Sequence, residues 1–335
     1  MEKAKIKLIC QLVEADGQNV AARLADKEHV SRQAASAWLA AARQEGVISS
    51  EGTGRGVRYA LATLASASKV YQREGLSEDI VWRELCAPML RELPDNVRGI
   101  WQHAMTEMIN NAVDHSGSGQ VTVAMQMNAL FTEGFVADAG EGIFMKIQKA
   151  LDLYDTREAI LELAKGKFTT DPTHHSGEGI FFSSKMMDRY TIRSGKLHFD
   201  HRGEGPDWLL EHESDVIGTQ VSMRLANDST RTAKEVFDRF ALPEEFSFAK
   251  TTVPVRLAQH EGETLVSRSQ AKRLTRRFER FQSVVLDFSG VDEIGQAFAD
   301  EVFRVFQNAH PDISMMPSNA SAAISAMIKR VQNPT

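Results

Sequence analysis

Apolar positions along this chain repeat with either the helical or the strand period. The order in which the two patterns occur divides the chain into three regions. In residues 1–62, apolar residues recur at helical spacing, and two strand-like runs around a glycine-rich segment follow. Three helices and a β-hairpin are therefore predicted. The helices are expected at about residues 3–14, 19–25 and 31–44, and the strands at residues 46–50 and 57–61.

The middle region, residues 76–228, follows an alanine- and serine-rich segment at residues 61–68 that marks a predicted boundary. Apolar residues between Ile100 and Ala112 keep one stripe at helical spacing, so a helix is predicted there. The apolar run at residues 135–137 is predicted to be a buried strand that ends at Asp138.

The last region, residues 248–332, alternates between strand-like and helical segments and predicts a small α/β domain. Strands are expected at residues 251–257, 264–266, 284–288 and 313–316, and helices at residues 269–281, 296–308 and 320–331. The three regions together predict an α/β and α+β multidomain protein.

Three polar clusters in the middle region have chemistry suited to a nucleotide. Glu107 and Asn111 stand four residues apart, so on a helix both side chains lie on one face. A carboxylate can polarise a water molecule for attack on phosphorus, and an amide oxygen can bind Mg²⁺. The Asp138 carboxylate, at its strand end, can accept a hydrogen bond from the exocyclic amine of adenine.

Glycines accompany the second cluster and form the third. Gly140 and Gly142 leave room for a flat ring beside the backbone. Gly177 and Gly179 precede a helical run, and backbone N–H groups at a helix N-terminus bind phosphate oxygens. Each cluster also has a structural interpretation as a turn, a strand cap or a solvated helix face.

In their order and spacing, and together with Thr219, the clusters resemble the motifs of GHKL ATPases, which include gyrase, the heat-shock chaperone, histidine kinases and MutL. The resemblance covers about residues 76–226. It implies a GHKL (Bergerat) α/β sandwich, with a mixed sheet layered with helices on one side. It also implies ATP and Mg²⁺ as cofactors and a homodimer formed through the nucleotide domains.

By the same resemblance, Glu107 is expected to be the general base, Asn111 the Mg²⁺ ligand and Asp138 the residue that recognises adenine. The other motif residues are expected to contact the nucleotide: Gly140 and Gly142 at the adenine-side turn, Gly177 and Gly179 in the phosphate loop, and Thr219 near the adenine.

Residues 164–175 are polar, contain a proline and resemble the mobile lid of this family. Lys165 or Lys167 can touch phosphate from there, although lysines on a loop are more often solvated. His174 and His175 are adjacent, but no cysteine or acidic cluster nearby completes a metal site. We therefore expect both histidines to be lid residues near the γ-phosphate.

The N-terminal pattern resembles a winged helix-turn-helix, in which the third helix enters the major groove of DNA. This implies that Arg32, Gln33 and Ser36 face bases or phosphates, and that Arg55 and Arg58 contact the backbone from the wing. Residues 1–60 hold nine basic and seven acidic side chains. This excess is small, so a structural or protein-binding module stays open as an alternative.

Residues 286–298 resemble STAS domains, and more closely the STAS-like module found beside prokaryotic GHKL domains. A protein partner for this module is a possibility. Anti-sigma antagonists of the STAS family carry a phosphorylatable serine where this chain has Gly295, Gln296 and Ala297. Regulation by phosphorylation is therefore not expected at that point, and Ser289 is expected to cap a strand exit instead.

Composition limits the remaining possibilities. The 335 residues include only two cysteines, the formal net charge is −6, and no apolar run approaches the length of a membrane span. No signal peptide is recognised. We expect a protein of the reduced cytoplasm that has no membrane partner, and any nucleic-acid binding is expected to be local to one basic module.

These features favour an ATP-binding and ATP-hydrolysing DNA-binding transcriptional regulator whose GHKL domain changes conformation with nucleotide state. One alternative is a serine or histidine protein kinase of the anti-sigma or two-component type. No helical hairpin with a phosphoacceptor histidine precedes the nucleotide motifs, which disfavours it. A non-catalytic ATP sensor or assembly module is the other alternative, but it has no need of Glu107.

Overall fold

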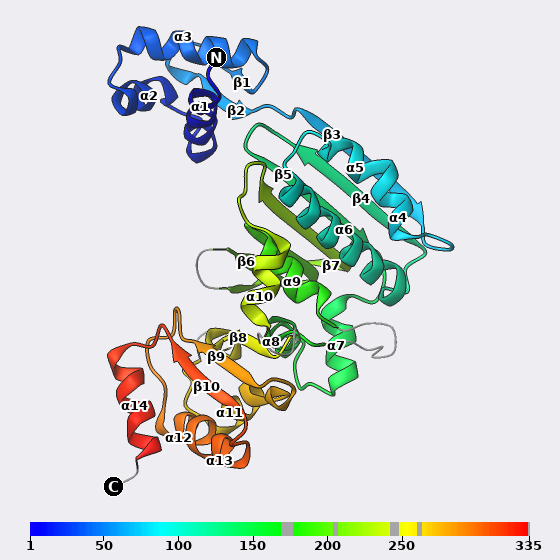
Figure 1. The fold of residues 1–335 in the computed structure, drawn as a ribbon, viewed down its shortest axis with the longest axis vertical. Coiled ribbons are helices and arrows are strands. Elements are labelled where there is room, and N and C mark those ends of the chain that lie inside the picture. The colour runs from blue at the N-terminus through cyan, green and yellow to red at the C-terminus, as the bar shows by residue number, and fades with distance from the viewer. Residues whose placement is uncertain (169–176, 204–206, 242–247, 260–262, 334–335) are drawn as a thin grey trace.

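The computed structural model describes residues 1–168, 177–203, 207–241, 248–259 and 263–333. Three parts follow one another along its long axis: an N-terminal module, a central part with a five-stranded sheet, and a C-terminal part with a three-stranded sheet (Figure 1). At this level the prediction of an α/β multidomain protein is confirmed. In the part of the chain that the structure describes, no helix has the length and apolar character needed to cross a membrane.

The N-terminal module has the three helices and the hairpin that the sequence predicts. The Ser31 hydroxyl accepts a hydrogen bond from the Ala34 N–H at 3.1 Å and so caps the third helix. A separate small core around Ile9, Leu24 and Leu39 holds the module together. Its elements are α1 (Lys3–Ala15), α2 (Val20–Glu28), α3 (Arg32–Gln44), β1 (Ile48–Glu51) and β2 (Arg58–Leu61).

The central sheet has the strand order β3-β4-β5-β7-β6, and every neighbouring pair is antiparallel. The strands are β3 (Ala65–Gln72), β4 (Gln120–Met127), β5 (Phe131–Asp138), β6 (Arg189–Arg202) and β7 (Trp208–Ala226). The expected mixed sheet is therefore wrong. β5 and β6 run in the same direction, but β7 lies between them and is antiparallel to both. No two parallel strands are therefore neighbours in this sheet. The sheet also begins at Ala65, before the expected domain start at residue 76.

Helices cover one face of this sheet, and α6 crosses it (Figure 1). In β4, Val121, Val123 and Met125 are buried, whereas the residues between them are more exposed, so one face of the strand enters the core. The helices are α4 (Glu78–Val81), α5 (Ala87–Leu90), α6 (Asp95–His115), α7 (Ile143–Leu151), α8 (Glu158–Lys165), α9 (Gly179–Met186) and α10 (Ala233–Phe240).

The C-terminal sheet is parallel, with the strand order β10-β9-β8. Its strands are β8 (Lys250–Pro254), β9 (Ser283–Asp287) and β10 (Ser314–Ser318), and its helices are α11 (Arg268–Thr275), α12 (Gln296–Asp300), α13 (Gln307–Ala309) and α14 (Ala322–Gln332). A π-helical segment, Glu301–Phe306, joins α12 to α13. The predicted small α/β domain is confirmed.

Two local predictions for this domain are wrong. The helix expected at residues 269–281 ends at Thr275, because Arg276 has a non-helical ψ of 131° and Arg277 then takes a left-handed conformation with φ of 64°. The strand expected at residues 264–266 is only a single bridge between Leu265 and Ile294. By contrast, the Ser289 hydroxyl donates to Asp287 Oδ1 at 2.7 Å, as expected for a cap at the strand exit.

The central and C-terminal parts share one hydrophobic core, and α8 lies at the junction between them. Lys165, at the end of α8, is 0% exposed. Its Nζ donates to Glu162 Oε1 at 2.7 Å and to the carbonyl oxygens of Arg273 and Arg276 at 3.2 and 2.9 Å. The expectation of a solvated or phosphate-binding lysine at this position is therefore wrong, because the C-terminal domain encloses its ammonium group.

Burial in this junction lowers the pKa of Lys165 to about 8, against an ordinary value of 10.5, although the Glu162 carboxylate acts in the opposite direction. Between these two pH values the unfolded chain binds more protons than the folded chain. The free energy of unfolding therefore rises with pH in this window, because a neutral lysine is less costly to bury.

We predict that Lys165→Met removes this pH dependence. Between pH 8 and pH 10, the wild-type protein should gain on the order of 1 kcal/mol per pH unit relative to Lys165→Met in urea unfolding. The exposed Lys149 provides the control variant Lys149→Met, which should keep a constant difference from the wild type. A constant difference for Lys165→Met as well would show that Lys165 does not titrate in this window.

Candidate functional site

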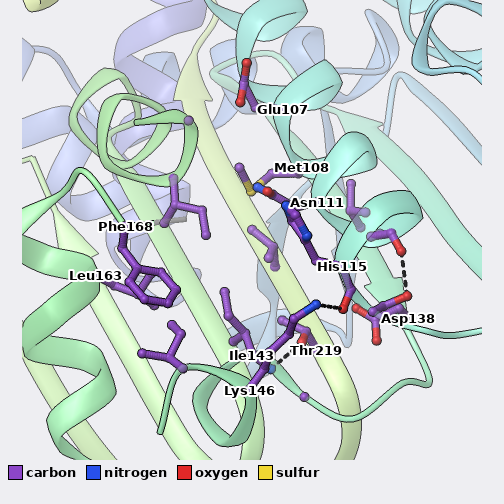
Figure 2. A pocket seen from close by; sticks show the side chains of 18 of the residues that line it. Glu107, Met108, Asn111, His115, Asp138, Ile143, Lys146, Leu163, Phe168 and Thr219 are labelled. Carbon is purple, nitrogen blue, oxygen red and sulfur yellow. Dashed lines mark hydrogen bonds between the residues drawn. The ribbon is translucent and has the colours of Figure 1, made fainter. Parts of the chain in front are cut away.

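One face of α6 borders a cavity of about 260 Å³. Glu107, Asn111 and His115 stand on successive turns of this helix, and Figure 2 shows them in a row along the cavity. The opposite wall comes from residues that follow α8 and from the start of α9. The cavity is lined by Glu107, Met108, Asn111, Ala112, His115, Ser116, Val136, Asp138, Gly142, Ile143, Lys146, Ile147, Leu163, Phe168, Gly177, Gly179, Ile180, Phe181, Thr219 and Val221.

The carboxylate of Glu107 lies directly against the start of α9. A Cβ atom added to Gly179 would stand only 1.9 Å from Glu107 Oε2, so the Glu107 carboxylate occupies the space that a side chain at position 179 would take. The first and third polar clusters of the sequence therefore meet at one end of the cavity. The Glu107 carboxylate therefore lies near the backbone N–H groups at the N-terminus of α9, where a negative charge is favoured.

Asn111 lies in the middle of the row. Its Nδ2 atom is buried and has no hydrogen-bond partner among the described residues. A buried amide without a partner costs about 1–3 kcal/mol, so this atom favours a bound polar ligand in the cavity. The amide oxygen of the same side chain has the chemistry of a Mg²⁺ ligand.

Asp138 ends β5 at the other end of the cavity (Figure 2). Its Oδ1 accepts a hydrogen bond from the Gly140 N–H at 2.8 Å. Burial raises the pKa of the Asp138 carboxyl, and hydrogen bonds from Gly140 and Thr219 partly offset this effect. The Thr219 hydroxyl in turn accepts from the Ile143 N–H at 3.0 Å, which ties α7 to β7 beside Asp138.

The role expected for Gly140 at the adenine-side turn stays a prediction, and the structure adds a packing reason for this glycine. This residue does not line the cavity; a Cβ atom there would lie 1.9 Å from the Ser116 carbonyl oxygen. The space that glycine leaves is therefore taken by the end of α6. Gly142 does line the cavity, and it precedes the first residue of α7.

Gly177 and Gly179 line the cavity, and their role in binding phosphate stays a prediction. The Phe168 N–H donates to the Gly177 carbonyl oxygen at 3.1 Å, which joins the two ends of the intervening segment. Residues 169–176, and with them the expected lid residues His174 and His175, lie outside the described residues. No group of three or more metal-binding side chains is present in the part of the chain that the structure describes.

Lys146 and His115 line the cavity but were not among the predicted site residues. Lys146 Nζ donates to the His115 carbonyl oxygen at 2.6 Å, so a positive charge stands beside the end of α6. The sequence carried a signal for both. His115 follows Asn111 by four residues, and Lys146 follows Gly142 by four residues on the next helix.

The predicted DNA-binding residues lie away from this cavity, in the N-terminal module. Arg32, Gln33 and Ser36 are exposed on the first turns of α3 and form one accessible face. Arg58 is exposed on β2, where its guanidinium faces the Gln18 side chain. The side chain of Arg55 lies outside what the structure describes.

Comparison with known proteins addresses the C-terminal part. Residues 270–324 match a family described as a STAS-like domain of unknown function (DUF4325). No GHKL-type or winged-helix family model matches the chain. No curated protein matches it either. The comparison therefore indicates a STAS-like domain in the C-terminal part of this α/β multidomain protein, and the resemblances of the other two parts rest on their residues.

We predict that Gly140→Ala destabilises the protein because the added methyl group meets a backbone carbonyl. The free energy of unfolding in urea should fall by roughly 1–3 kcal/mol, as for other overpacked sites. Gly119→Ala is the matched control, since nothing lies within 4 Å of a Cβ atom there. Equal stabilities for the two variants would contradict the close approach of Gly140 to Ser116.

Proposed function

We propose that this protein is an ATP-binding and ATP-hydrolysing regulator with a GHKL-type nucleotide domain, a DNA-binding winged helix and a STAS-like module. One observation carries the proposal. Glu107 and Asn111 of α6, Asp138 of β5 and Gly179 of α9 border one cavity, in which the buried Asn111 amide nitrogen has no partner among the described residues. That combination supports a ligand with both polar and apolar parts.

The arrangement of charges around the cavity determines the orientation in which the proposed nucleotide binds. The adenine lies at the Asp138 end, where the carboxylate accepts from its exocyclic amine and Val136 and Ile143 provide apolar walls. The phosphates lie toward Gly177 and Gly179, where α9 begins. Glu107 and His115 are eight positions apart, which corresponds to roughly 12 Å along the helix axis and leaves room for an extended ligand.

In this proposal two residues of α6 carry out the hydrolysis. Asn111 would hold Mg²⁺ through its amide oxygen, and the ion would neutralise charge on the phosphate oxygens. Glu107, four residues earlier, stands at the phosphate end, where it would orient the attacking water and accept its proton. Nucleotide state would act on the rest of the chain by favouring one arrangement of the central part over another, including a homodimer formed through this part.

The DNA-binding component rests on the accessible face of α3. Arg32 and Gln33 have side chains suited to base edges and phosphates, and Ser36 is exposed one turn further along. The helix is capped by Ser31 and backed by its own core, so it presents these residues from a rigid element. With this surface at one end of the molecule and the STAS-like module at the other, the nucleotide domain lies between them (Figure 1).

The test of the catalytic role is Glu107→Gln, which removes the base but keeps the shape of the side chain. Phosphate release from Mg-ATP should fall about 100-fold or more, while the Kd for ATP changes little. Glu141→Gln is the matched control, because Glu141 adjoins the cavity-lining Gly142 but is itself exposed. A Glu107→Gln protein that releases phosphate at the wild-type rate would exclude Glu107 as the base.

For the DNA-binding role, we predict that Arg32→Ala combined with Arg55→Ala weakens binding to duplex DNA. The slope of log K against log salt should become shallower by about 2, since two phosphate contacts are lost. Arg330→Ala, which removes an exposed arginine of α14, should leave both affinity and slope unchanged. If the double variant binds fluorescent duplexes as the wild type does, the N-terminal module has a different partner.

A further inference from the structure

A buried cluster of charges joins α8 of the central part to the STAS-like module. Glu162 is 1% exposed and pairs on one side with Lys165 at 2.7 Å. On the other side, Glu162 Oε2 pairs with Arg277 Nη1 at 2.9 Å, and Arg277 is 7% exposed. The side chain of Arg277 therefore extends from the C-terminal module and contacts α8 of the central part. Near the surface, Arg276 Nη1 pairs with Glu158 at 3.4 Å.

The same segment of the STAS-like module holds the backbone that follows α8. Arg277 Nη2 donates to the carbonyl oxygen of Lys167, and Arg280 Nη1 donates to the same oxygen at 3.1 Å. In return, Lys167 Nζ donates to the Arg280 carbonyl oxygen at 3.0 Å. Lys167 has φ of 52°, a conformation that a non-glycine residue keeps only when its surroundings enforce it. Two arginine side chains supply that enforcement.

This backbone leads straight into the wall of the cavity. Leu163, on the last turn of α8, and Phe168 both line it, and the Arg277 guanidinium lies over the Phe168 ring at 5.4 Å. Phe168 is also hydrogen-bonded to Gly177, one of the glycines at the proposed phosphate end. One residue of the STAS-like module thus contacts a cavity-lining side chain and also fixes the chain immediately before it.

We propose that Arg277 and Arg280 are positioning residues of the nucleotide pocket, so that the STAS-like module sets nucleotide affinity through the backbone at residues 166–168. This inference rests on the proposed function and names the regulation of the same site. Because coupling between two sites is reciprocal, a bound nucleotide should also strengthen the docking of residues 276–281 on α8. Any partner that draws this segment away from α8 would then weaken nucleotide binding.

The test compares three variants of the full-length protein by calorimetry with ADP and with a non-cleavable ATP analogue. Arg280→Ala removes an exposed side chain, so the fold should survive and the Kd should rise about three-fold or more. Arg277→Lys keeps a positive charge for Glu162 but loses the planar fork that reaches two acceptors, so its Kd should also rise. Arg268→Ala removes another exposed arginine of the same module, whose ion pairs with Asp300 and Glu301 lie within that module, and should bind like the wild type.

Two further readouts separate positioning from general stability. The urea midpoint of Arg280→Ala should match that of Arg268→Ala, whereas its amide hydrogen exchange at residues 163–168 should be faster. The addition of nucleotide should slow this exchange in the wild type, and also slow exchange at residues 276–281.

The outcomes distinguish this inference from the function on which it rests. Weaker binding by Arg280→Ala and Arg277→Lys, with Arg268→Ala unchanged, supports the inference. If the wild type binds nucleotide and all three variants match it within two-fold, the proposed function stands and the positioning role is overturned. If the wild type binds neither nucleotide, both proposals fail.

Discussion

The packing of α6 against the antiparallel sheet is the constraint on which the candidate site depends. Trp101, Met105 and Met108 on this helix are buried and belong to the same hydrophobic core as the buried residues of β4 and β5. Because the helix has 3.6 residues per turn, fixing this apolar face also fixes the direction of Glu107, Asn111 and His115. The alignment of these three polar residues along the cavity is therefore a consequence of core packing and requires no strained backbone in α6.

The second constraint is the buried ionic junction between α8 and the STAS-like module. Removing one member of a buried ion pair leaves an uncompensated charge at a cost of about 3–5 kcal/mol, so such pairs keep two surfaces in one register. Here Glu162 is placed between Lys165 and Arg277, and the Lys167 carbonyl oxygen accepts a further hydrogen bond from Arg277. The cavity consequently has one wall whose position depends on the C-terminal module.

Local patterns in the sequence predicted the elements that depend on local physics. The third N-terminal helix, the presence of α6 and the end of β5 at Asp138 follow from hydrogen bonding and periodicity within a few residues. They could be assigned without knowledge of any partner. The row of Glu107 and Asn111 on one helix face is of the same kind.

The features that the sequence did not predict depend on contacts between distant segments. Lys165 resembles a loop lysine until the carbonyls of Arg273 and Arg276, more than 100 residues away, enclose it. Gly140 resembles part of a ligand-binding turn, and nothing in the local pattern indicates that the Ser116 carbonyl lies beside it. The position of β7 between β5 and β6 likewise depends on the packing of the whole sheet. The residue pattern of the individual strands does not predict it.

The function proposed above requires that separate segments in the middle of the chain form one pocket for an adenine nucleotide. The most direct measurement is isothermal titration calorimetry of the purified wild-type protein with a magnesium-bound, non-cleavable ATP analogue, made at two temperatures so that a zero enthalpy is not mistaken for no binding. The account predicts saturable binding of one nucleotide per chain that ADP competes away. An absence of heat at both temperatures, from protein that is folded by circular dichroism, would contradict it.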